Sequence, residues 1–548
     1  MSTLTLQRLS LPLVVASVLI LGSVLLYHGY RTRSFYRNLP GPPHSWLFGH
    51  LKVMREIAAL MPFNCHPQLY YTEITHRYNI QGIFYLDLWP IGPGTVVITD
   101  PKLIELAPVP KPLPVHPQTD KFLSLIVGKG CIAALSGGLW KKMHNAMSPA
   151  FSPTHVRNLT GVMINETVAF ISQLERLSAT GEIFSMEEAL SKVLFDIVAR
   201  VVFNVPLHAQ TTGSQVHADL RALVNLARQE TDIRVAYNPV IQISRRWRRR
   251  QVFKRLESSL LDRIYNRLEL LLSQGAVPSR QNPTSILDLI LREYVEGLNN
   301  IGDKSQGEHI KLSKTDEALI LSRLVILLLG GHSTSTNALS YLFMLLSKAP
   351  DVVEKIHEEH VQVLGTHPQT TLRTNPETLH KLPYTEAVIK ESLRLFPSGS
   401  SLHQGPPGAT VYHNGQNFPI DNDLVVTTNG HGIHNDPSIY PDPTTFRPER
   451  WLGPDKVSLG SGYFRPFGGD GRSCPGQGMG MSMLKVIVVM TVGDYTFECA
   501  GLKPSVKPRT FHTDLDVTFG DIVFQQLGLE GRPRDGMMMT VKKRTEVC

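Results

Sequence analysis

The feature that most constrains this chain is a glycine-rich stretch near its C-terminal end, Phe467-Gly-Gly-Asp-Gly-Arg-Ser-Cys-Pro-Gly476. It places Cys474 beside Arg472 and just ahead of a helix-like run from Met479 to Thr491. Backbone N–H groups, a helix N-terminus and a nearby cation all favour the charged form of a cysteine. The stretch therefore predicts a loop that holds Cys474 as a thiolate.

A thiolate held in this way is a candidate ligand for a haem iron. Thiolate donation makes the iron able to cleave O–O bonds, and glycines let a loop pass close under a flat macrocycle. Phe467 can cover the sulfur from solvent, and the guanidinium of Arg472 has a fork suited to a haem carboxylate. The plainer alternative is a glycine-rich turn with an incidental buried cysteine, which is the usual explanation for a lone cysteine.

The N-terminal leader predicts a membrane-spanning helix. Leu9 to Tyr27 is apolar and uncharged for about 19 residues, enough to cross roughly 30 Å of hydrocarbon as a helix. More arginines follow this run than precede it (Arg31, Arg33 and Arg37 against Arg8), so the bulk of the chain is expected in the cytosol. A cleaved signal peptide is the alternative, but no small-residue cleavage site ends the run cleanly.

Composition places the rest of the chain in one large globular domain. Hydrophobic residues make up 42% of the 548 residues and charged residues 19%, which excludes a disordered chain. No linker or repeat follows the stiff connector Leu39-Pro-Gly-Pro-Pro43, so we expect an anchor with its basic flank at 1–38 and one domain at 39–548. The formal charge of +8 suits an anionic membrane or an acidic partner, and nucleic acid is the weakest reading.

A long apolar run from about Thr315 to Leu346 predicts a buried core helix. Arg323 and the central glycine pair argue against a membrane span. Glycines and hydroxyl residues in the middle, Gly330-Gly-His-Ser-Thr-Ser335, weaken the helical ladder, and a local opening there can seat dioxygen or water. His332 within this patch is better explained as a satisfied core histidine than as a ligand.

Two further patterns place paired side chains on predicted helices. Glu391 and Arg394 share one helical face, and if they are buried they must satisfy each other and further partners. Trp140 and His144 also share a face, although such a pair is more often packing than binding.

Secondary-structure signals elsewhere are of two kinds. Ile83 to Trp89 and Thr95 to Thr99 alternate or are β-branched, and they predict a two-stranded piece of sheet joined by a turn at 90–94. Residues 160 to 300 are mostly helical by periodicity. Within them Ser244-Arg-Arg-Trp-Arg-Arg-Arg250 is either a solvated helix face or a membrane-surface contact.

Taken together, these segments resemble the cytochrome P450 family. The glycine-rich stretch is similar to the family's haem-binding signature, Phe-x-x-Gly-x-Arg-x-Cys-x-Gly, at Phe467, Arg472, Cys474 and Gly476. The patch at 330–335 looks like the family's oxygen-activation motif, with Thr334 on its threonine. The resemblance implies that Cys474 is the axial ligand of the haem iron.

The resemblance also implies a structural triad that braces the haem loop. Glu391 and Arg394 are similar to the family's Glu-x-x-Arg helix, which locks to an arginine in a later loop. That loop is recognisable in Phe446-Arg-Pro-Glu-Arg-Trp451, and Arg450 then completes the triad.

This chain departs from the family pattern at several site positions. Asp470 stands where the signature has glycine, and Ser333 stands where the oxygen motif has an acid, so proton delivery is expected to run through hydroxyls and water. Trp140 and His144 resemble the family's Trp-x-x-x-Arg propionate clamp with histidine in place of arginine, and His403 lies near another propionate-binding arginine. Two haem-clamping arginines are thus expected as histidines.

The resemblance implies a mainly α fold with a small β subdomain behind an N-terminal transmembrane helix. It implies a haem-thiolate monooxygenase that inserts one oxygen atom from O2 into a small, hydrophobic organic substrate. NADPH–cytochrome P450 reductase is the expected electron donor, and the endoplasmic reticulum membrane is the expected location, with the catalytic domain cytosolic. The wording of several motifs looks most like fungal microsomal members of secondary metabolism.

Two other functions remain open at this point. One is a haem-thiolate isomerase or dehydratase that acts without O2, which the missing acid at Ser333 mildly favours. The other is a membrane-tethered haem or ligand sensor without turnover, for which the retained Thr334 has no evident use.

Overall fold

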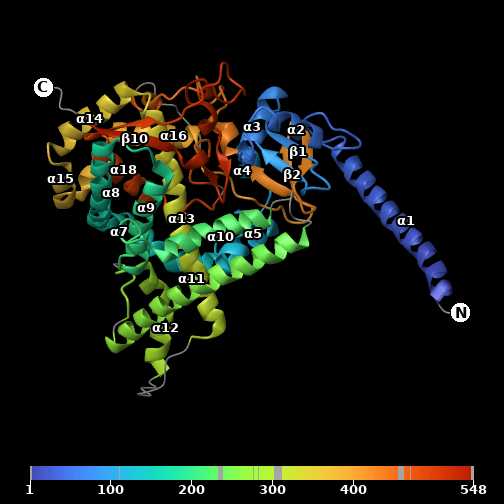
Figure 1. Ribbon diagram of the computed structural model, residues 1–548, viewed down its shortest axis with the longest axis horizontal. Helices are drawn as coiled ribbons and strands as arrows, with labels where there is room; N and C mark the ends of the chain where they lie inside the picture. The colour runs from blue at the N-terminus through green and yellow to red at the C-terminus, as the bar shows by residue number, and fades with distance from the viewer. Residues whose placement is uncertain are drawn as a thin grey trace.

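The computed structural model describes residues 3–109, 111–231, 238–275, 277–281, 283–301, 312–453, 462–469 and 471–544, without the side chains of 3–14 and 298–301. The described residues form a mainly helical body, a small β subdomain beside it, and one long helix that projects away from both (Figure 1). The expected class, mainly α with a small β subdomain, is confirmed.

The helices of the body follow one another along most of the chain. In order they are α2 (Leu51–Ala58), α3 (Pro67–Arg77), α4 (Lys102–Leu106), α5 (Pro117–Val127), α6 (Gly137–Met147), α7 (Pro153–Asn158), α8 (Thr160–Thr180), α9 (Met186–Phe203), α10 (Gln215–Glu230), α11 (Pro239–Ser273), α12 (Ile286–Ile301), α13 (Lys314–Leu346), α14 (Pro350–Leu364), α15 (Pro368–Thr374), α16 (Pro383–Leu395), α17 (Gly430–His434), α18 (Gln477–Thr491) and α19 (Asp516–Phe519).

Helix α13 runs through the middle of the body (Figure 1). It begins after Ser313, whose hydroxyl accepts the N–H of Asp316, and the acidic Asp316 and Glu317 in its first turn complement the helix dipole. Its apolar sides pack against α9, α16, α18 and α5, so most of its C-terminal half is buried. The helix is continuous through the glycine and hydroxyl patch, where the sequence led us to expect a local opening.

The β subdomain is built on a three-stranded sheet in the order β1 (Ile83–Leu86), β2 (Thr95–Ile98) and β6 (Val425–Thr428). β1 and β2 are antiparallel, with Leu86 opposite Thr95, and β6 joins β2 in parallel from more than three hundred residues later. A hairpin of β4 (Thr410–His413) and β5 (Gln416–Pro419) adjoins α4. The first strand ends three residues earlier than predicted, and Asp87 is thereby released to pair with Arg33.

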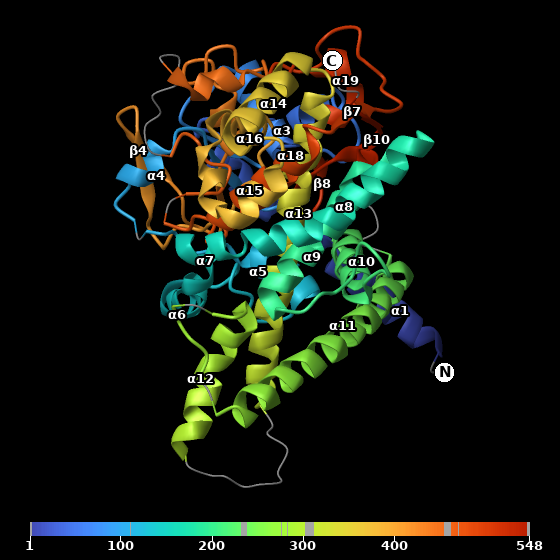
Figure 2. The same cartoon turned by 90° about the vertical axis from the view of Figure 1, so that its left-hand side faces the viewer.

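A second set of strands lies near the C-terminal end of the chain. β3 (Phe184–Ser185), β10 (Met538–Lys543) and β7 (Tyr495–Cys499) form one sheet in that order. β8 (Gln526–Leu527) and β9 (Gly531–Arg532) form a short antiparallel hairpin whose turn spans 528–530. This hairpin lies beside α13 (Figure 2), and the hydroxyl of Tyr341 donates to the carbonyl of Arg532 at 3.1 Å.

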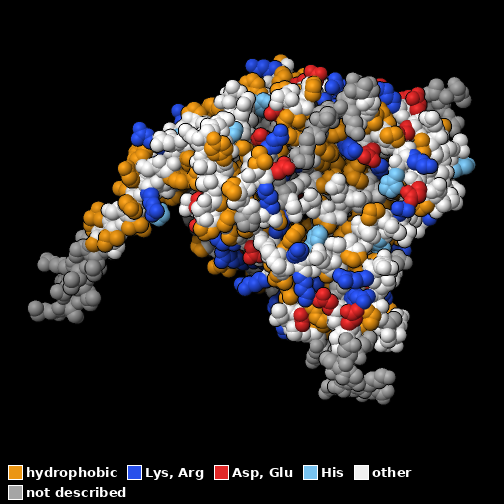
Figure 3. All heavy atoms as spheres, turned by 180° about the vertical axis from the view of Figure 1, so that it is seen from behind, with side chains coloured by type: hydrophobic (Ala, Val, Ile, Leu, Met, Phe, Trp, Pro, Cys, Tyr) orange, Lys and Arg blue, Asp and Glu red, His pale blue; other side chains and the backbone are white. Residues whose placement is uncertain are grey.

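Helix α1 (Thr3–Tyr36) projects from the β subdomain, with its apolar side chains on the outside (Figure 3). Large hydrophobic side chains from Val15 to Tyr30 are more than half exposed along it, among them Leu19, Ile20 and Leu26. Near its end, Arg33 is buried and pairs with Asp87, 2.5 Å from Nη1 to Oδ2. By length and hydropathy, the helix that qualifies as a membrane span within the described residues is α13, which is half buried in the protein.

Candidate active site

The cysteine loop lies between a turn at 462–468 and the start of α18. The N–H of Cys474 donates to the carbonyl of Phe467 at 2.8 Å, which closes the loop on itself. Gly468 and Gly471 adopt φ values of +79° and +80°, a region that side chains with a Cβ rarely enter. Glycines are therefore required here by the backbone. Asp470, the departure from the family signature, lies outside the described residues.

The side chain of Cys474 is exposed, in contrast to the other cysteines that the structure describes: Cys65 and Cys131 are buried and Cys499 is half-buried. Protein nevertheless crowds the thiol, and this burial raises its pKa, while the N–H of Gly476 opposes the rise. The first turn of α18 follows directly, and its dipole, like the N–H of Gly476, works against this rise.

Arg472 joins the cysteine loop to α6. Its Nη1 donates to the carbonyl of Leu135 at 2.8 Å, and its guanidinium carbon lies 4.7 Å from the centroid of the Trp140 ring. Burial lowers the pKa of this guanidinium. The rings of Trp140 and His144 are 5.1 Å apart, and Nδ1 of His144 lies 3.3 Å from the hydroxyl of Ser148. The structure thus gathers three of the predicted cofactor-binding residues, Arg472, Trp140 and His144.

His403 lies in the β subdomain, beside β6. Its backbone exchanges two hydrogen bonds of 2.8 Å with Val426 of β6, and its Nδ1 lies 3.2 Å from the carbonyl of Leu113. These contacts fix the residue at the edge of the sheet.

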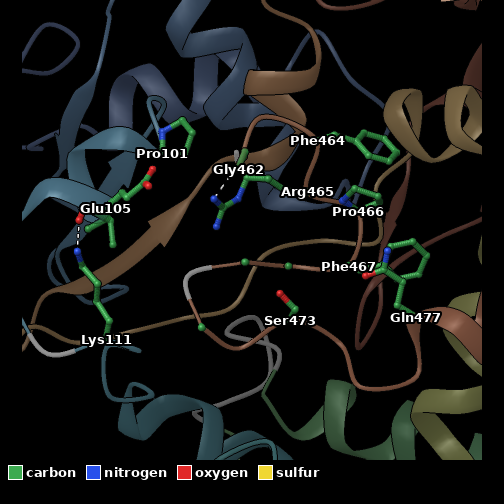
Figure 4. Close-up of a pocket in the computed structure, with 14 residues that line it drawn as sticks. Pro101, Glu105, Lys111, Gly462, Phe464, Arg465, Pro466, Phe467, Ser473 and Gln477 are labelled. Atoms are coloured by element: carbon green, nitrogen blue, oxygen red, sulfur yellow. Dashed lines mark hydrogen bonds between the residues drawn. The ribbon is translucent and has the colours of Figure 1, made fainter. Parts of the chain in front are cut away.

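A cavity of about 470 Å³ opens along one flank of the cysteine loop (Figure 4). Its walls come from α4, the segment after it and the loop, and Arg465 and Ser473 point toward its middle. Lys111 closes another side by donating to the carbonyl of Glu105. The loop that carries Cys474 is therefore approachable from outside on this flank.

On α13, the predicted oxygen-activation residues lie on adjoining faces. The hydroxyl of Thr334 donates to the carbonyl of Gly330 at 2.8 Å, and Gly330 is exposed although it lies in the middle of a core helix. His332 is buried, with Nδ1 2.7 Å from the carbonyl of Leu328, as expected for a satisfied core histidine. Ser333 lies on the adjoining face of α13, and its hydroxyl donates a hydrogen bond to a carboxylate oxygen of Glu530.

Glu391, Arg394 and Arg450 form a fully buried cluster. Arg394 makes two bonds of 2.9 Å to the two carboxylate oxygens of Glu391, and Nε of Arg450 adds a third at 2.9 Å. The indole N–H of Trp451 and the backbone N–H of Arg447 also donate to this carboxylate, at 3.0 and 3.1 Å. Each arginine spends its other donors on backbone carbonyls, so the cluster is closely satisfied.

Sequence reasoning missed Glu530. It lies in the turn of the β8–β9 hairpin and also accepts a hydrogen bond from the amide of Asn337 at 3.0 Å. Burial raises the pKa of its carboxyl group, although part of the residue stays open to a small cavity. Gly528-Leu-Glu-Gly531 reads as an ordinary turn, so no local pattern marks this residue.

The comparison with family models shows which family the chain belongs to. The model described as Cytochrome P450 matches residues 39–516. The chain belongs to the cytochrome P450 family. The P450 fold also agrees with a solved structure, the crystal structure of cytochrome P450DA heme domain, which has a TM-score of 0.71 and 18% identity, and the match covers 92% of this chain and 97% of that one.

Several fungal monooxygenases are similar in sequence to this P450. Cytochrome P450 monooxygenase polC of Polytolypa hystricis is 28% identical, covering 87% of this chain and 86% of that protein. Cytochrome P450 monooxygenase acrF of Aspergillus aculeatus is also 28% identical, covering 88% and 98%. Cytochrome P450 monooxygenase ptmG of Penicillium ochrochloron is 24% identical over 99% and 96%. The P450 is a monooxygenase that takes a redox partner and small-molecule substrates.

Haem with an axial cysteine thiolate is the cofactor of the family, and the residues of this P450 fit it. Cys474 has an open side chain at a helix N-terminus, as a thiolate ligand requires. A Cβ added at Gly476 would lie 3.7 Å from the Cys474 sulfur, so the loop is closely wrapped around that atom. Gly330 has no side chain and is exposed, so backbone atoms of α13 lie open at this point.

Proposed function

We propose that this P450 is a membrane-anchored monooxygenase that inserts one oxygen atom from O2 into a small, hydrophobic organic substrate. Its electrons come from NADPH through a separate NADPH–cytochrome P450 reductase. The observation that carries the proposal is the open side chain of Cys474 at the N-terminus of α18, in a loop whose glycines the backbone requires. Haem bound there supplies thiolate-ligated iron for O–O cleavage.

The roles of the loop residues follow from their contacts. Cys474 is the axial ligand, and the N–H of Gly476 steadies the charge on its sulfur. Phe467 is half-buried and packs against the core beside α18, where it limits water at the loop. Arg472 spends only part of its donor fork on backbone carbonyls, and its other donors suit a haem carboxylate.

Two histidines are proposed as weaker partners for the haem carboxylates. His144 lies on the same face of α6 as Trp140, beside Arg472, and His403 is fixed at the sheet edge. A neutral imidazole gives one hydrogen bond, whereas an imidazolium adds a charge, so this clamp is weaker than one made of arginines.

Thr334 and Ser333 are proposed as the hydroxyl groups that manage protons near the bound oxygen. Thr334 donates to the Gly330 carbonyl, so its oxygen is left to accept a hydrogen bond on the exposed face of α13. Ser333 connects that region of the helix with Glu530.

Helix α1 is proposed as the membrane anchor. Among its described side chains, the large hydrophobic ones from Val15 to Tyr30 are exposed (Figure 3). A second apolar stripe, Val240, Ile243 and Trp247, follows one face of α11 at helical spacing and is 62–74% exposed. Arginines interleave with this stripe, and such a combination suits the headgroup region of an anionic membrane. The proposed location is the endoplasmic reticulum, with residues 39–548 in the cytosol.

The approachable flank of the cysteine loop is proposed to receive the reductase. Lys111 lines the cavity there, and Lys141 is exposed on α6, the helix joined to the loop by Arg472. Cations at this place steer an acidic partner toward the haem loop. The similarity to fungal monooxygenases supports a role in secondary metabolism.

The first test replaces Cys474. We expect the C474S protein to fold but to lose the carbon-monoxide absorption band of thiolate-ligated ferrous haem, together with all NADPH-dependent oxygen insertion. C499S, which removes a half-buried thiol elsewhere, is the control and should keep both. A thiolate band that survives in C474S would show that another residue binds the iron.

The second test concerns the membrane. When the full chain is expressed with a reductase, we expect it to stay in the membrane fraction after an alkaline wash, and a chain lacking residues 1–38 to be released. The substrate class can then be found by comparing lipophilic metabolites of cells with and without the full chain. Alkaline release of the full chain would contradict the anchor.

A further inference from the structure

The β8–β9 hairpin is joined to one face of α13 by a row of polar contacts. Ser333 and Asn337 donate to Glu530, and Tyr341 donates to the carbonyl of Arg532. These three helix residues are spaced four apart, so they form one stripe along α13. Glu530 is the charged member of the contact, and it comes from a segment 197 residues away from Ser333.

Ser333 lies between this stripe and the proposed oxygen side of the helix. Thr334 is the next residue, and consecutive residues of an α-helix are rotated by about 100° around its axis. Thr334 and the exposed Gly330 therefore face a different space from Glu530. A group that contacts Glu530 on one side and neighbours Thr334 on the other is suited to pass a proton across the helix.

Glu530 and Ser333 both line a cavity of about 70 Å³ between α13, the hairpin, α9 and α10. That volume is enough for a few water molecules, and the cavity is lined by polar side chains that include Glu187, Arg221 and Asn225. Water in the cavity has hydrogen-bond partners on several elements, so a proton can reach Glu530 from this side.

The reaction itself needs protons. Each turnover joins one substrate C–H bond, one O2, two electrons and two protons, and gives one hydroxylated substrate and one water. Hydroxyl groups such as Ser333 and Thr334 relay protons but do not supply them at neutral pH, because they are not acidic. A carboxyl group at the end of the relay meets that need.

We propose that Glu530 supplies, from the β8–β9 hairpin, the carboxyl group that α13 lacks at Ser333, and that it acts as a positioning residue that feeds protons to the oxygen side through the Ser333 hydroxyl. The protonated carboxyl gives its proton to Oγ of Ser333, and Ser333 releases its own hydroxyl proton toward the Thr334 side. A proton from the bulk solvent, passed on by water in the cavity, then returns to the carboxylate of Glu530, so the relay is reset. The inference rests on the proposed roles of Ser333 and Thr334.

The charged groups around Glu530 come from four elements. Arg532 of the hairpin favours the carboxylate, and Glu187 of α9 opposes it. Arg221 of α10 and His332 of α13 line the same cavity, and burial lowers the pKa of His332 to about 4, so this imidazole is neutral at physiological pH. The raised pKa of Glu530 brings its proton exchange closer to neutral pH, where a relay acid works best.

The first measurement does not depend on turnover. Infrared titration of the full-length holoprotein, as the difference between wild type and E530Q, should reveal one carboxyl C=O band that titrates above the normal glutamate range. S333A should shift this band, because the carboxyl loses its hydroxyl partner. A Glu530 band that is unaffected by S333A, or that titrates like a surface glutamate, would overturn the proposal.

The second measurement is NADPH oxidation by the full chain with reductase, in H2O and in D2O. E530Q should lower the rate by about tenfold or more, since positioned proton transfer contributes ~10²–10⁴-fold. It should also increase the ratio of the rates in H2O and D2O, because protons then arrive by a slower route. The thiolate band with carbon monoxide must stay, which shows that the haem site is intact.

Two variants separate a proton relay from a mere structural tie. N337A removes the other hydrogen bond between α13 and Glu530 but leaves the carboxyl group on Ser333, so its rate and isotope ratio should stay near those of wild type. The double variant S333D/E530Q moves the carboxyl group onto the helix and should recover most of the lost rate. An equal loss in N337A and E530Q, or no recovery in the double variant, would overturn the proposal. If wild type oxidises no NADPH at all, the proposed electron supply fails, and the infrared result still decides the carboxyl contact.

Discussion

Two glutamates flank the candidate active site, and their surroundings are opposite in kind. Glu391 is fully buried and accepts hydrogen bonds from two guanidinium groups, an indole N–H and a backbone N–H. Glu530 accepts hydrogen bonds from a serine hydroxyl and an asparagine amide and stays partly open to a small cavity of mixed lining. The first carboxylate is hydrogen-bonded to two guanidinium groups, whereas the second is hydrogen-bonded to neutral donors and adjoins a cavity with room for water.

The difference shows how one fold can use the same side chain for support and for chemistry. Removing a partner from a closely satisfied ion cluster leaves buried charge behind, so such a cluster holds elements together. A carboxyl group whose hydrogen-bond partners are neutral can gain or lose a proton at lower cost to its surroundings, since no cation is hydrogen-bonded to it and Arg532 acts on it only through its charge. The contacts of Glu391 therefore suit a structural role, and those of Glu530 suit the proton transfer proposed for it.

The largest expected effect is the loss of the charge on Glu391. E391Q leaves Arg394 and Arg450 buried without their counter-charge, and we expect the free energy of unfolding to fall by about 3–5 kcal/mol. Urea unfolding of the holoprotein, followed by haem absorbance and circular dichroism, measures it. E354Q, which breaks a surface pair with Arg544, should cost less than about 1 kcal/mol. If the free energy of unfolding fell equally in E391Q and E354Q, the buried cluster would be no more important for stability than a surface ion pair.

A smaller effect is expected when one donor to Glu391 is removed and both arginines stay. W451F deletes the indole N–H that lies 3.0 Å from the carboxylate and should lower the free energy of unfolding by about 1–3 kcal/mol. The same urea titration measures it. A loss as large as that of E391Q would mean that ring packing, and not the charge, dominates the cluster.

The smallest effect on stability is expected at Glu530. Because the pKa of this group is raised by burial, its favourable contribution is complete below the unfolded value near 4.5 and is lost as the pH rises through the folded value. E530Q should therefore match wild type at low pH and be the more stable protein above that window, with a slope difference of at most about 1.4 kcal/mol per pH unit. Urea midpoints measured across the window test this. If the urea midpoints of wild type and E530Q changed in parallel with pH, Glu530 would not titrate with a raised pKa, and its contrast with Glu391 would fail.

The same contrast marks what the sequence could predict. Glu391 and Arg394 lie three residues apart on one helix, so local spacing pointed to this pair, and the family resemblance of the later loop pointed to Arg450. The long apolar run predicted α13 to within a residue, because its period and its start are local properties.

Contacts between distant segments were out of reach of that reasoning. Nothing in the sequence around Ser333 shows that a hairpin turn some two hundred residues later places a carboxylate on it. The sequence therefore led us to expect a relay of hydroxyls and water alone. Likewise, Arg33 was counted as a positive flank of the leader, whereas the structure buries it against Asp87.

That buried pair has a mechanical consequence. Arg33 also donates to the carbonyls of Trp89 and Leu47, so the last turn of α1 is clamped to the sheet from several directions. The proline connector comes after this clamp in the chain, so the clamp itself holds the end of α1 against the β subdomain. The end of α1 is thus fixed to the body, and the angle at which the helix projects sets the orientation of the catalytic domain relative to that helix.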